Sequence, residues 1–583
     1  MNLSLDAYSP AARELLGPGG AYELDEVAIN GVPIPVFKNA PAHLRELYQG
    51  ALKHSTDTFF VYENERYTFA DAWREVKRVM SALQQHNVKP GTRVGISMRN
   101  YPEWVFAYMG ITSLGAVAVA MNAWWTGEEM IFAVEDSGLQ TLFVDRERLE
   151  HLAPYLDTYS LQVVAVRTQN VAGNGVQSWA DFLDSSNGTS PIPDTILEPT
   201  PNSMPDIDPD APAMMLYTSG STARPKGVVS SHRAIIHSVL GWEASAALAR
   251  ADAGRRQRPP ARQPCMIITV PLFHVTGLNG QLLPSLRNGR KVVAMYKWEV
   301  DKALALIERE QVTHFSGVPT MAYELVNSPN YDKYDLSSLR SIGGGGAAMT
   351  PKHSKSIEQR SGNQTRASAA YAMTETNGLG ASNAGASLQA KPASCGRPLR
   401  PLVSIRIIDE AGNPVPPGAT GEICIKGPMN FTEYWNRPEE TATTLIDGWV
   451  HTGDLGSIDD DGDLFITGRA KEMIIRGGEN IACAEVESVI YEHPNVAECA
   501  VFGVPDERLG EVVAAAVVAK AGAILTAGDI QSHVSEHLAR FKVPAHVVLF
   551  DKQLPRIASG KIHKRGVRDA FQKHMSHNLV PQS

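Results

Sequence analysis

Apolar and polar positions along the first two-thirds of the chain follow the patterns of strands and helices in alternation. Short apolar runs that fit buried strands fall at residues 93–98, 140–144 and 163–167, and a helical pattern at 128–137 precedes the second. Strands that alternate with helices are typical of parallel α/β layers. The N-terminal part is therefore predicted to consist of layered α/β subdomains.

The pattern changes after about Pro398. Short β-like runs at 403–409, 421–426 and 463–467 are separated by turns rich in Asp and Gly, which predicts a β-rich subdomain. The last part mixes a helical segment at 483–492 with an apolar strand at 512–520. The fold class is predicted as α/β, with a large N-terminal domain of layered α/β and β-rich subdomains and a small mobile α+β C-terminal domain.

The expected boundary lies near residues 468–471. The predicted units are an N-terminal extension at 1–50, a large domain at 51–468 and a small lid domain at 469–583.

One stretch is apolar enough to suggest a membrane helix. Residues 104–125 carry no charge over a length that could span a bilayer. The small and polar residues near Ser113 and Gly115 predict a break there, with a buried helix before it and a buried strand at 116–120. We therefore expect a protein core and no transmembrane segment.

The amino-acid composition is that of an ordinary globular protein. Of 583 residues, 43% are apolar and 20% are charged, as in ordinary globular proteins, and the formal net charge of −9 argues against nucleic-acid binding. An arginine cluster between Arg250 and Arg262 is expected to be a solvated surface loop. The alternative is a patch for an anionic partner, such as a phosphorylated cofactor or a lipid surface.

Cysteine usage favours a reducing compartment. The five cysteines are scattered, odd in number and without CxxC spacing, which argues against disulfides and against a zinc site. The first 20 residues lack the basic start and apolar core of a signal peptide. A cytoplasmic location is therefore expected.

The strongest local signal is the string from Tyr217 to Val228, YTSGSTARPKGV, which follows an apolar strand-like run. Two glycines permit close backbone approach, and hydroxyls, backbone N–H groups and Lys226 together form an anion nest. It is not a Walker loop, because Lys226 stands between Pro225 and Gly227 instead of opening a helix.

This string resembles the phosphate-binding signature of the adenylate-forming superfamily, which includes acyl-CoA synthetases, aryl-CoA ligases, luciferases and peptide-synthetase adenylation domains. The resemblance covers roughly residues 50 to 570, and the chain looks most like a bacterial-type fatty acyl-CoA synthetase. It implies nucleotide contacts from Thr218, Ser219, Gly220, Ser221, Thr222 and Lys226.

Two further motifs resemble nucleotide-binding stations of the superfamily. The run at 343–349 resembles a glycine-rich adenine loop and implies contacts from Gly345, Gly346 and Ala347. The sequence YAMTE at 371–375 resembles an aromatic–Gly–x–Thr–Glu motif. The implied roles in that motif are adenine stacking by Tyr371 beside Ala372, phosphate contact by Thr374, and Mg²⁺ binding by Glu375.

Two alanines depart from the pattern. Ala223 and Ala372 stand where the superfamily commonly has glycine. Either these backbones need no positive φ, or nucleotide binding is weakened.

Three motifs toward the C-terminus complete the resemblance. In HTGD at 451–454, Asp454 is implied to bind the ribose hydroxyls. In GRAKE at 468–472, Arg469 is implied to hold ribose or phosphate and Lys471 to act as the hinge of the lid. In the motif at 555–562, Lys561 corresponds to the catalytic lysine.

The resemblance also implies sites for the acyl group and for coenzyme A. The expected acyl pocket contains His274, Val275, Gly277 and Val318, and His274 is also a candidate catalytic residue. The expected coenzyme A contacts are Arg476, Gly477, Gly478 and Glu479.

The implied reaction has two steps and uses ATP, Mg²⁺ and coenzyme A. A carboxylate attacks the α-phosphorus of ATP to give an acyl-adenylate, and the acyl group then passes to the thiol. Apolar and small pocket residues suggest a medium- or long-chain fatty acid, and hence a role in fatty acid metabolism. The alternatives are an aryl-acid CoA ligase, an adenylation enzyme serving a carrier protein in trans, and a non-catalytic nucleotide-binding protein; a homodimer is left open.

Overall fold

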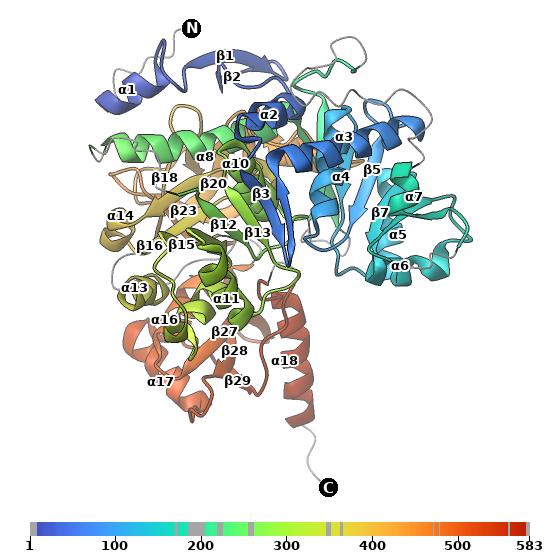
Figure 1. Ribbon diagram of the computed structural model, residues 1–583. Helices are drawn as coiled ribbons and strands as arrows, with labels where there is room; N and C mark the ends of the chain where they lie inside the picture. Colours follow the sequence, from blue (N-terminus) through green and yellow to red (C-terminus); the bar gives the residue numbers. More distant parts are fainter. Residues whose placement is uncertain are drawn as a thin grey trace.

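The computed structural model describes residues 8–168, 173–184, 204–218, 225–252, 254, 262–345, 351–361, 365–469, 472–476, 479–557 and 560–578, with the side chains of 345, 351–353, 479–480 and 576–578 left out. Figure 1 shows a large body of layered sheets and helices above a small C-terminal body. The predicted α/β architecture, with its β-rich part late in the large domain, is confirmed.

One sheet of the large domain has eight strands among the described residues. From β10 to β9 neighbouring strands are parallel, whereas β11 and β21 add to the edge in antiparallel fashion. Strands β6 and β7 are buried along their whole length, as expected for parallel strands covered on both faces. In sheet order the strands are β21 (Glu433–Tyr434), β11 (Lys226–Ser231), β10 (Pro212–Thr218), β6 (Val117–Ala120), β5 (Arg93–Ser97), β7 (Thr141–Asp145), β8 (Gln162–Val166) and β9 (Val176–Ser178).

The second sheet has fourteen strands and changes character along its length. Pairing is parallel from β3 to β16 and antiparallel from β16 onward, so the β-rich subdomain continues the α/β sheet. In sheet order the strands are β19 (Ser404–Ile408), β20 (Gly421–Lys426), β23 (Trp449–Ile458), β24 (Leu464–Arg469), β18 (Ser394–Pro398), β17 (Ala381–Ala384), β16 (Arg366–Tyr371), β15 (Ser341–Gly345), β14 (His314–Gly317), β12 (Cys265–Ile268), β13 (Lys291–Ala294), β3 (Thr58–Tyr62) and β4 (Glu65–Thr68), with β22 (Leu445–Ile446) paired to β23.

The apolar stretch at 104–125 forms a core helix and a core strand, as predicted. Helix α4 (Pro102–Ser113) is buried on nearly every side, and it is followed by β6 of the first sheet. Within the described residues, every helix is too short or too polar to cross a bilayer.

Helices α3 (Phe69–Gln85) and α5 (Gly127–Ser137) begin with capping boxes. The hydroxyl of Thr68 accepts from the amide of Asp71, and the same arrangement joins Thr126 and Glu129. These caps satisfy backbone donors that a helix start leaves unpaired. The sequence thus encodes where each helix starts, while the apolar faces decide what it packs on.

The N-terminal segment is packed onto the large domain. Helix α1 (Pro10–Leu16) and the hairpin β1 (Leu24–Ile29)–β2 (Val32–Phe37) lie over the long helix α8 (His232–Asp252) (Figure 1). The ring of Phe37 stacks on that of His237 with centroids 5.7 Å apart, and the Phe37 amide donates to His237 Nε2 at 3.1 Å.

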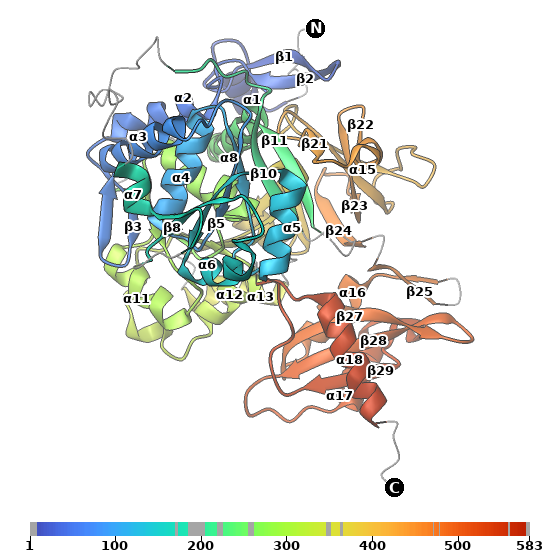
Figure 2. The same ribbon diagram turned by 90° about the vertical axis from the view of Figure 1, so that its right-hand side faces the viewer.

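The C-terminal body is a five-stranded sheet with helices on both sides. Figure 2 shows it below the large domain, reached through β24. We call it the lid. Its elements are β25 (Ile474–Arg476), β26 (Glu479–Ile481), α16 (Cys483–Glu492), β27 (Val496–Asp506), β28 (Gly510–Ala519), α17 (Ala527–His537), β29 (His546–Phe550) and α18 (Lys564–Asn578).

Two tryptophans provide a matched test of this core. Trp104 of α4 is fully buried, whereas Trp124 is 45% exposed and lies against Arg99. Trp104→Ala is expected to lower the free energy of unfolding by about 3–5 kcal/mol through cavity formation. Trp124→Ala should lose only about 0.5–1 kcal/mol of cation–π energy. Urea denaturation followed by circular dichroism measures both, and equal losses would contradict the assignment of α4 to the core.

Candidate functional site

A buried carboxylate joins three strands of the second sheet. Asp454 lies directly opposite Arg469 in the β23–β24 pair, and the Arg469 Nε donates to Asp454 Oδ1 at 3.0 Å. The hydroxyl of Tyr371, at the end of β16, donates to the other oxygen, Oδ2, at 2.7 Å. Burial and the neighbouring Asp454 charge raise the pKa of Tyr371, so its hydroxyl stays a donor. Three residues from separate motifs therefore form one polar cluster.

Glu375 is a second buried carboxylate close to the first. It lies in the short turn Thr374–Thr376 and is 8% exposed. Burial raises its pKa, which the hydroxyl of Tyr434 opposes by donating to Oε1 at 2.7 Å. A buried carboxylate with a second oxygen to offer suits a hard cation, so Glu375 fits the predicted Mg²⁺ ligand in chemistry and burial.

Lys226 already contacts an anionic side chain. It is the first residue of β11, pairs with Thr218 of β10, and forms an ion pair with Glu440 of α15 (Pro438–Thr444). Its ammonium also lies 5.0 Å from the centre of the Tyr434 ring. The phosphate-loop lysine and Glu375 therefore share Tyr434 as a neighbour.

Lys561 is carried on a tight turn of the lid. The amide of Gly560 donates to Ile557 O and that of Ile557 to Lys561 O, both at 2.8 Å, and Gly560 adopts a left-handed φ of 84°. Arg556 fixes the turn by donating to Gly560 O at 2.6 Å and to Glu498 Oε1 at 2.6 Å. These hydrogen bonds therefore hold Gly560 and Lys561 in the turn.

This turn docks on the large domain. A Cβ at Gly560 would lie 3.4 Å from Val318 Cγ2 and 3.3 Å from Met321 Cε, which places the turn against helix α12 (Pro319–Val326). Burial, and then the charge of Arg469, lower the pKa of Lys561, while Asp454 opposes the shift. The predicted catalytic lysine is thus brought to the Asp454 cluster.

His274 faces the same region. Burial and then the Lys561 charge lower its pKa to about 3, so its ring is neutral at physiological pH. Among the described residues, His274 Nε2 is one of the buried side-chain atoms without a hydrogen-bond partner. A neutral imidazole with one unpaired nitrogen is suited to contact a bound polar group.

The expected acyl-pocket residues lie on adjoining segments. Val275 and Gly277 form the single turn α9 (Val275–Gly277), and Val318 caps the start of α12. A Cβ at Gly378 would lie 3.2 Å from Val275 Cγ2, and the indole Nε1 of Trp242 donates to Gly378 O at 3.0 Å. Val275 and Trp242 therefore both contact Gly378, next to the expected acyl pocket.

Sequence reasoning missed a buried amide network that supports the Glu375 turn. Asn377 has a left-handed φ of 51°, and its side chain donates to Met429 O at 2.9 Å and accepts from Asn279 Nδ2 at 3.0 Å. Ser238 donates to Asn377 O at 2.7 Å. Tyr434 and Glu440 were missed as well; their segment shows only a helix-start pattern around Pro438, which carries no chemical signal.

Ala372 is outside the left-handed region. It is not among the residues with positive φ, so this backbone adopts its conformation without needing glycine. Ala223 lies outside the described residues.

Other predicted residues are only partly placed. Gly345 ends β15 and pairs with Ala370. Arg476 and Glu479 face each other in the β25–β26 hairpin, and Arg476 also pairs with Gly510 inside the lid sheet, away from the Lys561 turn. Ser219, Gly220, Ser221, Thr222, Gly346, Ala347, Lys471, Gly477 and Gly478 lie outside the described residues.

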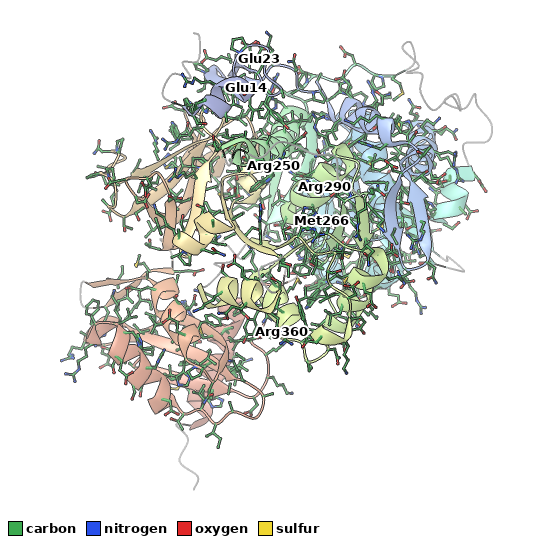
Figure 3. All side chains as sticks on the ribbon, turned by 60° about the vertical axis from the view of Figure 1, so that its left-hand side comes forward. Glu14, Glu23, Arg250, Met266, Arg290 and Arg360 are labelled. Carbon is green, nitrogen blue, oxygen red and sulfur yellow. The ribbon has the colours of Figure 1, made fainter. Side chains whose placement is uncertain are left out.

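Of the basic cluster, Arg250 and Arg262 belong to the described residues and have different neighbours. Figure 3 labels Arg250, on α8, and Arg290 nearby. Arg250 is one of the charges that act on Arg290, together with Glu243. Arg262 donates to Gln311. Neither contact involves the Asp454 cluster.

The chain is similar to known families and proteins over most of its length. The family model described as AMP-binding enzyme matches residues 47–435, and that of the AMP-binding enzyme C-terminal domain matches residues 485–561. An indoleacetate–CoA ligase from Aromatoleum aromaticum is 35% identical over 85% of this chain and 91% of its own.

Further relatives act on different acids by name. A feruloyl-CoA synthase from Amycolatopsis sp. is 34% identical over 86% of this chain and 94% of its own. A fatty acid–[acyl-carrier-protein] ligase from Streptomyces coeruleorubidus is 33% identical over 87% of this chain and 92% of its own. The solved structure of the anthranilate CoA ligase AuaEII with anthranoyl-AMP matches with a TM-score of 0.80 at 24% identity, covering 92% of this chain and 99% of its own, and supports the fold.

The Tyr371–Asp454 bond can be tested without any ligand. Tyr371→Phe removes a donor from a buried carboxylate and should lower the free energy of unfolding by about 1–3 kcal/mol. Tyr159→Phe, which removes an exposed hydroxyl bonded to Glu135 at 2.7 Å, should cost less than about 1 kcal/mol because water replaces it. Denaturant melts report both, and an unchanged midpoint for Tyr371→Phe would refute the bond.

Proposed function

The chain belongs to the AMP-binding enzyme family, and we propose that within it the protein converts an aromatic carboxylic acid to its CoA thioester through an acyl-adenylate. The reaction class is that of an AMP-forming acid–thiol ligase, which uses ATP, Mg²⁺ and coenzyme A. The single observation that supports the site best is the docking of the Lys561 turn of the lid on α12, from where Lys561 interacts electrostatically with Arg469 and Asp454 of the large domain.

Lys561 solves the electrostatic problem of the first step. The substrate carboxylate and the α-phosphate are both anions, and they must approach each other in a region of low dielectric. A buried ammonium there offsets the repulsion and holds both groups in line. Because burial and then the Arg469 charge lower the pKa of Lys561, an anion bound beside the lysine would favour its charged form.

We propose for the remaining residues the roles that the family resemblance implies. Asp454 accepts from the ribose hydroxyls, Arg469 binds ribose or phosphate, and Tyr371 packs against adenine. Thr374, Thr218 and Lys226 contact phosphate oxygens, with Lys226 exchanging its Glu440 partner for the nucleotide. Glu375 would hold Mg²⁺, whose charge neutralises the pyrophosphate leaving group. Lys471 would be the hinge that later turns Arg476 and Glu479 toward coenzyme A.

Two observations favour an aromatic acid over the fatty acid expected from pocket composition. Relatives named for indoleacetate and ferulate match over more than four-fifths of the chain. The contacts of Trp242 and Val275 with Gly378 also bring an indole ring next to an expected acyl-pocket residue, where an aromatic acid could pack against it. Medium- and long-chain fatty acids, and transfer to a carrier protein, remain the rival substrates that the experiment must compare.

The role of Lys561 is tested on separated half-reactions. Lys561→Ala should slow acid-dependent pyrophosphate release by about 10²–10³-fold, the usual effect of losing one transition-state contact. Thioester formation from preformed acyl-adenylate and coenzyme A should fall much less. Lys552→Ala, an exposed lysine of the same lid, is the matched control and should be unchanged. Near-normal pyrophosphate release by folded Lys561→Ala would refute the role.

Substrate class is tested with a panel of acids assayed for AMP release in the presence of coenzyme A. Indoleacetate, 4-coumarate and ferulate are compared with unbranched acids of eight to sixteen carbons (roughly the medium- to long-chain range). The best aromatic acid should exceed every unbranched acid in kcat/KM by about tenfold or more. Trp242→Ala should lower the ratio of kcat/KM for the aromatic acid to kcat/KM for the unbranched acids, because it removes the indole ring next to Gly378. A higher kcat/KM for an unbranched acid would overturn the aromatic proposal.

A further inference from the structure

Three donor side chains gather on one face of the lid helix α17. His533, Glu536 and His537 stand at positions i, i+3 and i+4, which neighbour one another on a helix surface. One donor atom from each lies within 4.8 Å of the others, and the two imidazole centroids are 4.6 Å apart. His533 is half-buried, and Glu536 and His537 are exposed. The cluster is therefore open to solvent on one side.

Backbone carbonyls fix the tautomers of both histidines. His533 Nε2 donates to Val489 O of α16 at 3.0 Å, and His537 Nδ1 donates to His533 O at 2.8 Å. A carbonyl only accepts, so each bond protonates one ring nitrogen and leaves the lone pair on the other in the neutral ring. Histidine ligands of metals usually donate their second nitrogen to such an outer partner. The ring of His493, 5.2 Å from that of His533, packs edge-on and holds it further.

The spacing suits a small divalent ion after a modest rotamer change. Zinc–nitrogen bonds of about 2.0–2.1 Å in tetrahedral geometry separate two ligand atoms by about 3.3 Å. The donors of this cluster are up to 4.8 Å apart. Exposed side chains such as Glu536 and His537 adjust by that amount without moving the helix. Two imidazoles and one carboxylate match the preference of Zn²⁺ and leave a position for water.

Two other donor clusters among the described residues are less suitable. In the cluster of Glu422, Cys424 and His451, burial raises the pKa of the Cys424 thiol to about 11, so the metal-binding thiolate is disfavoured. In the cluster of Asp459, Asp461 and Asp463, the ammonium of Lys391 is already bound to all three carboxylates at 2.5–2.9 Å. The α17 cluster has neither obstacle.

We propose that His533, Glu536 and His537 form a binding site for Zn²⁺ or a similar borderline divalent cation on the outer face of the lid. Figures 1 and 2 place α17 at the edge of the lid that is distant from the large domain. The site is thus separate from Glu375. Because His533 is bonded to α16, an ion held there stabilises the α16–α17 pair and, by mass action, the folded lid.

The experiment is calorimetric titration of chelator-treated full-length protein with zinc chloride. Wild-type protein should bind one equivalent at this site and show a higher lid melting temperature with zinc. His537→Gln should weaken binding at least tenfold, since even outer-shell changes cost about 10–100-fold. His574→Gln, an exposed histidine of α18, is the matched control and should bind as wild type.

His533→Gln is a second test, and circular dichroism checks that it folds despite losing the Val489 contact. Loss of zinc binding in both His537→Gln and His533→Gln supports the site. The proposal is overturned if both variants bind as tightly as wild type, if wild type binds no zinc up to about 1 mM, or if binding survives in them and disappears in His451→Gln.

Discussion

The burial of the Asp454 carboxylate is the constraint around which the candidate site is organised. An ionised group removed from water needs hydrogen bonds and an opposite charge. Tyr371 and Arg469 supply these from two other strands, so the carboxylate ties β16, β23 and β24 together. The cross-strand register opposite Arg469 is what makes the pairing available, because facing residues of an antiparallel pair lie within reach of each other. The register of the sheet thus determines which side chains surround the Asp454 carboxylate.

The second large effect is the crowding of positive charge around that carboxylate. Arg469 and the docked Lys561 both lie in its field: burial and then the Arg469 charge lower the pKa of Lys561, whereas Asp454 and Glu472 raise the pKa of Arg469 against the effect of burial. The charges of Lys561 and Arg469 beside Asp454 suit this part of the protein to an anionic ligand. The docking of the Lys561 turn on α12 is what brings the charge of the lid lysine to this part of the large domain.

Sequence reasoning succeeded where chemistry is local. Strand β20 and helix α16 begin and end at the residues that the apolar pattern predicts, and the motifs around Tyr371, Asp454 and Lys561 meet as the family resemblance implies. It failed for partners that come from elsewhere in the chain. Tyr434 is 59 residues from Glu375, and Glu440 belongs to a helix with no signal beyond its Pro438 start. The apolar periodicity of a segment predicts which of its faces is buried, but it does not predict which distant polar residue will contact that segment.

Ala372, which stands where the family commonly has glycine, can be compared with Gly380 on the neighbouring segment. Ala372 adopts a backbone conformation that needs no glycine, so the substitution introduces no φ strain beside Tyr371. Gly380 on the neighbouring segment is different, because a Cβ there would lie 2.3 Å from the carbonyl oxygen of Tyr371. The close approach of the Gly380 backbone to that of Tyr371 thus needs glycine at position 380. In this part of the chain, the glycine that the fold requires is therefore Gly380, on the neighbouring segment, and not the motif position occupied by Ala372.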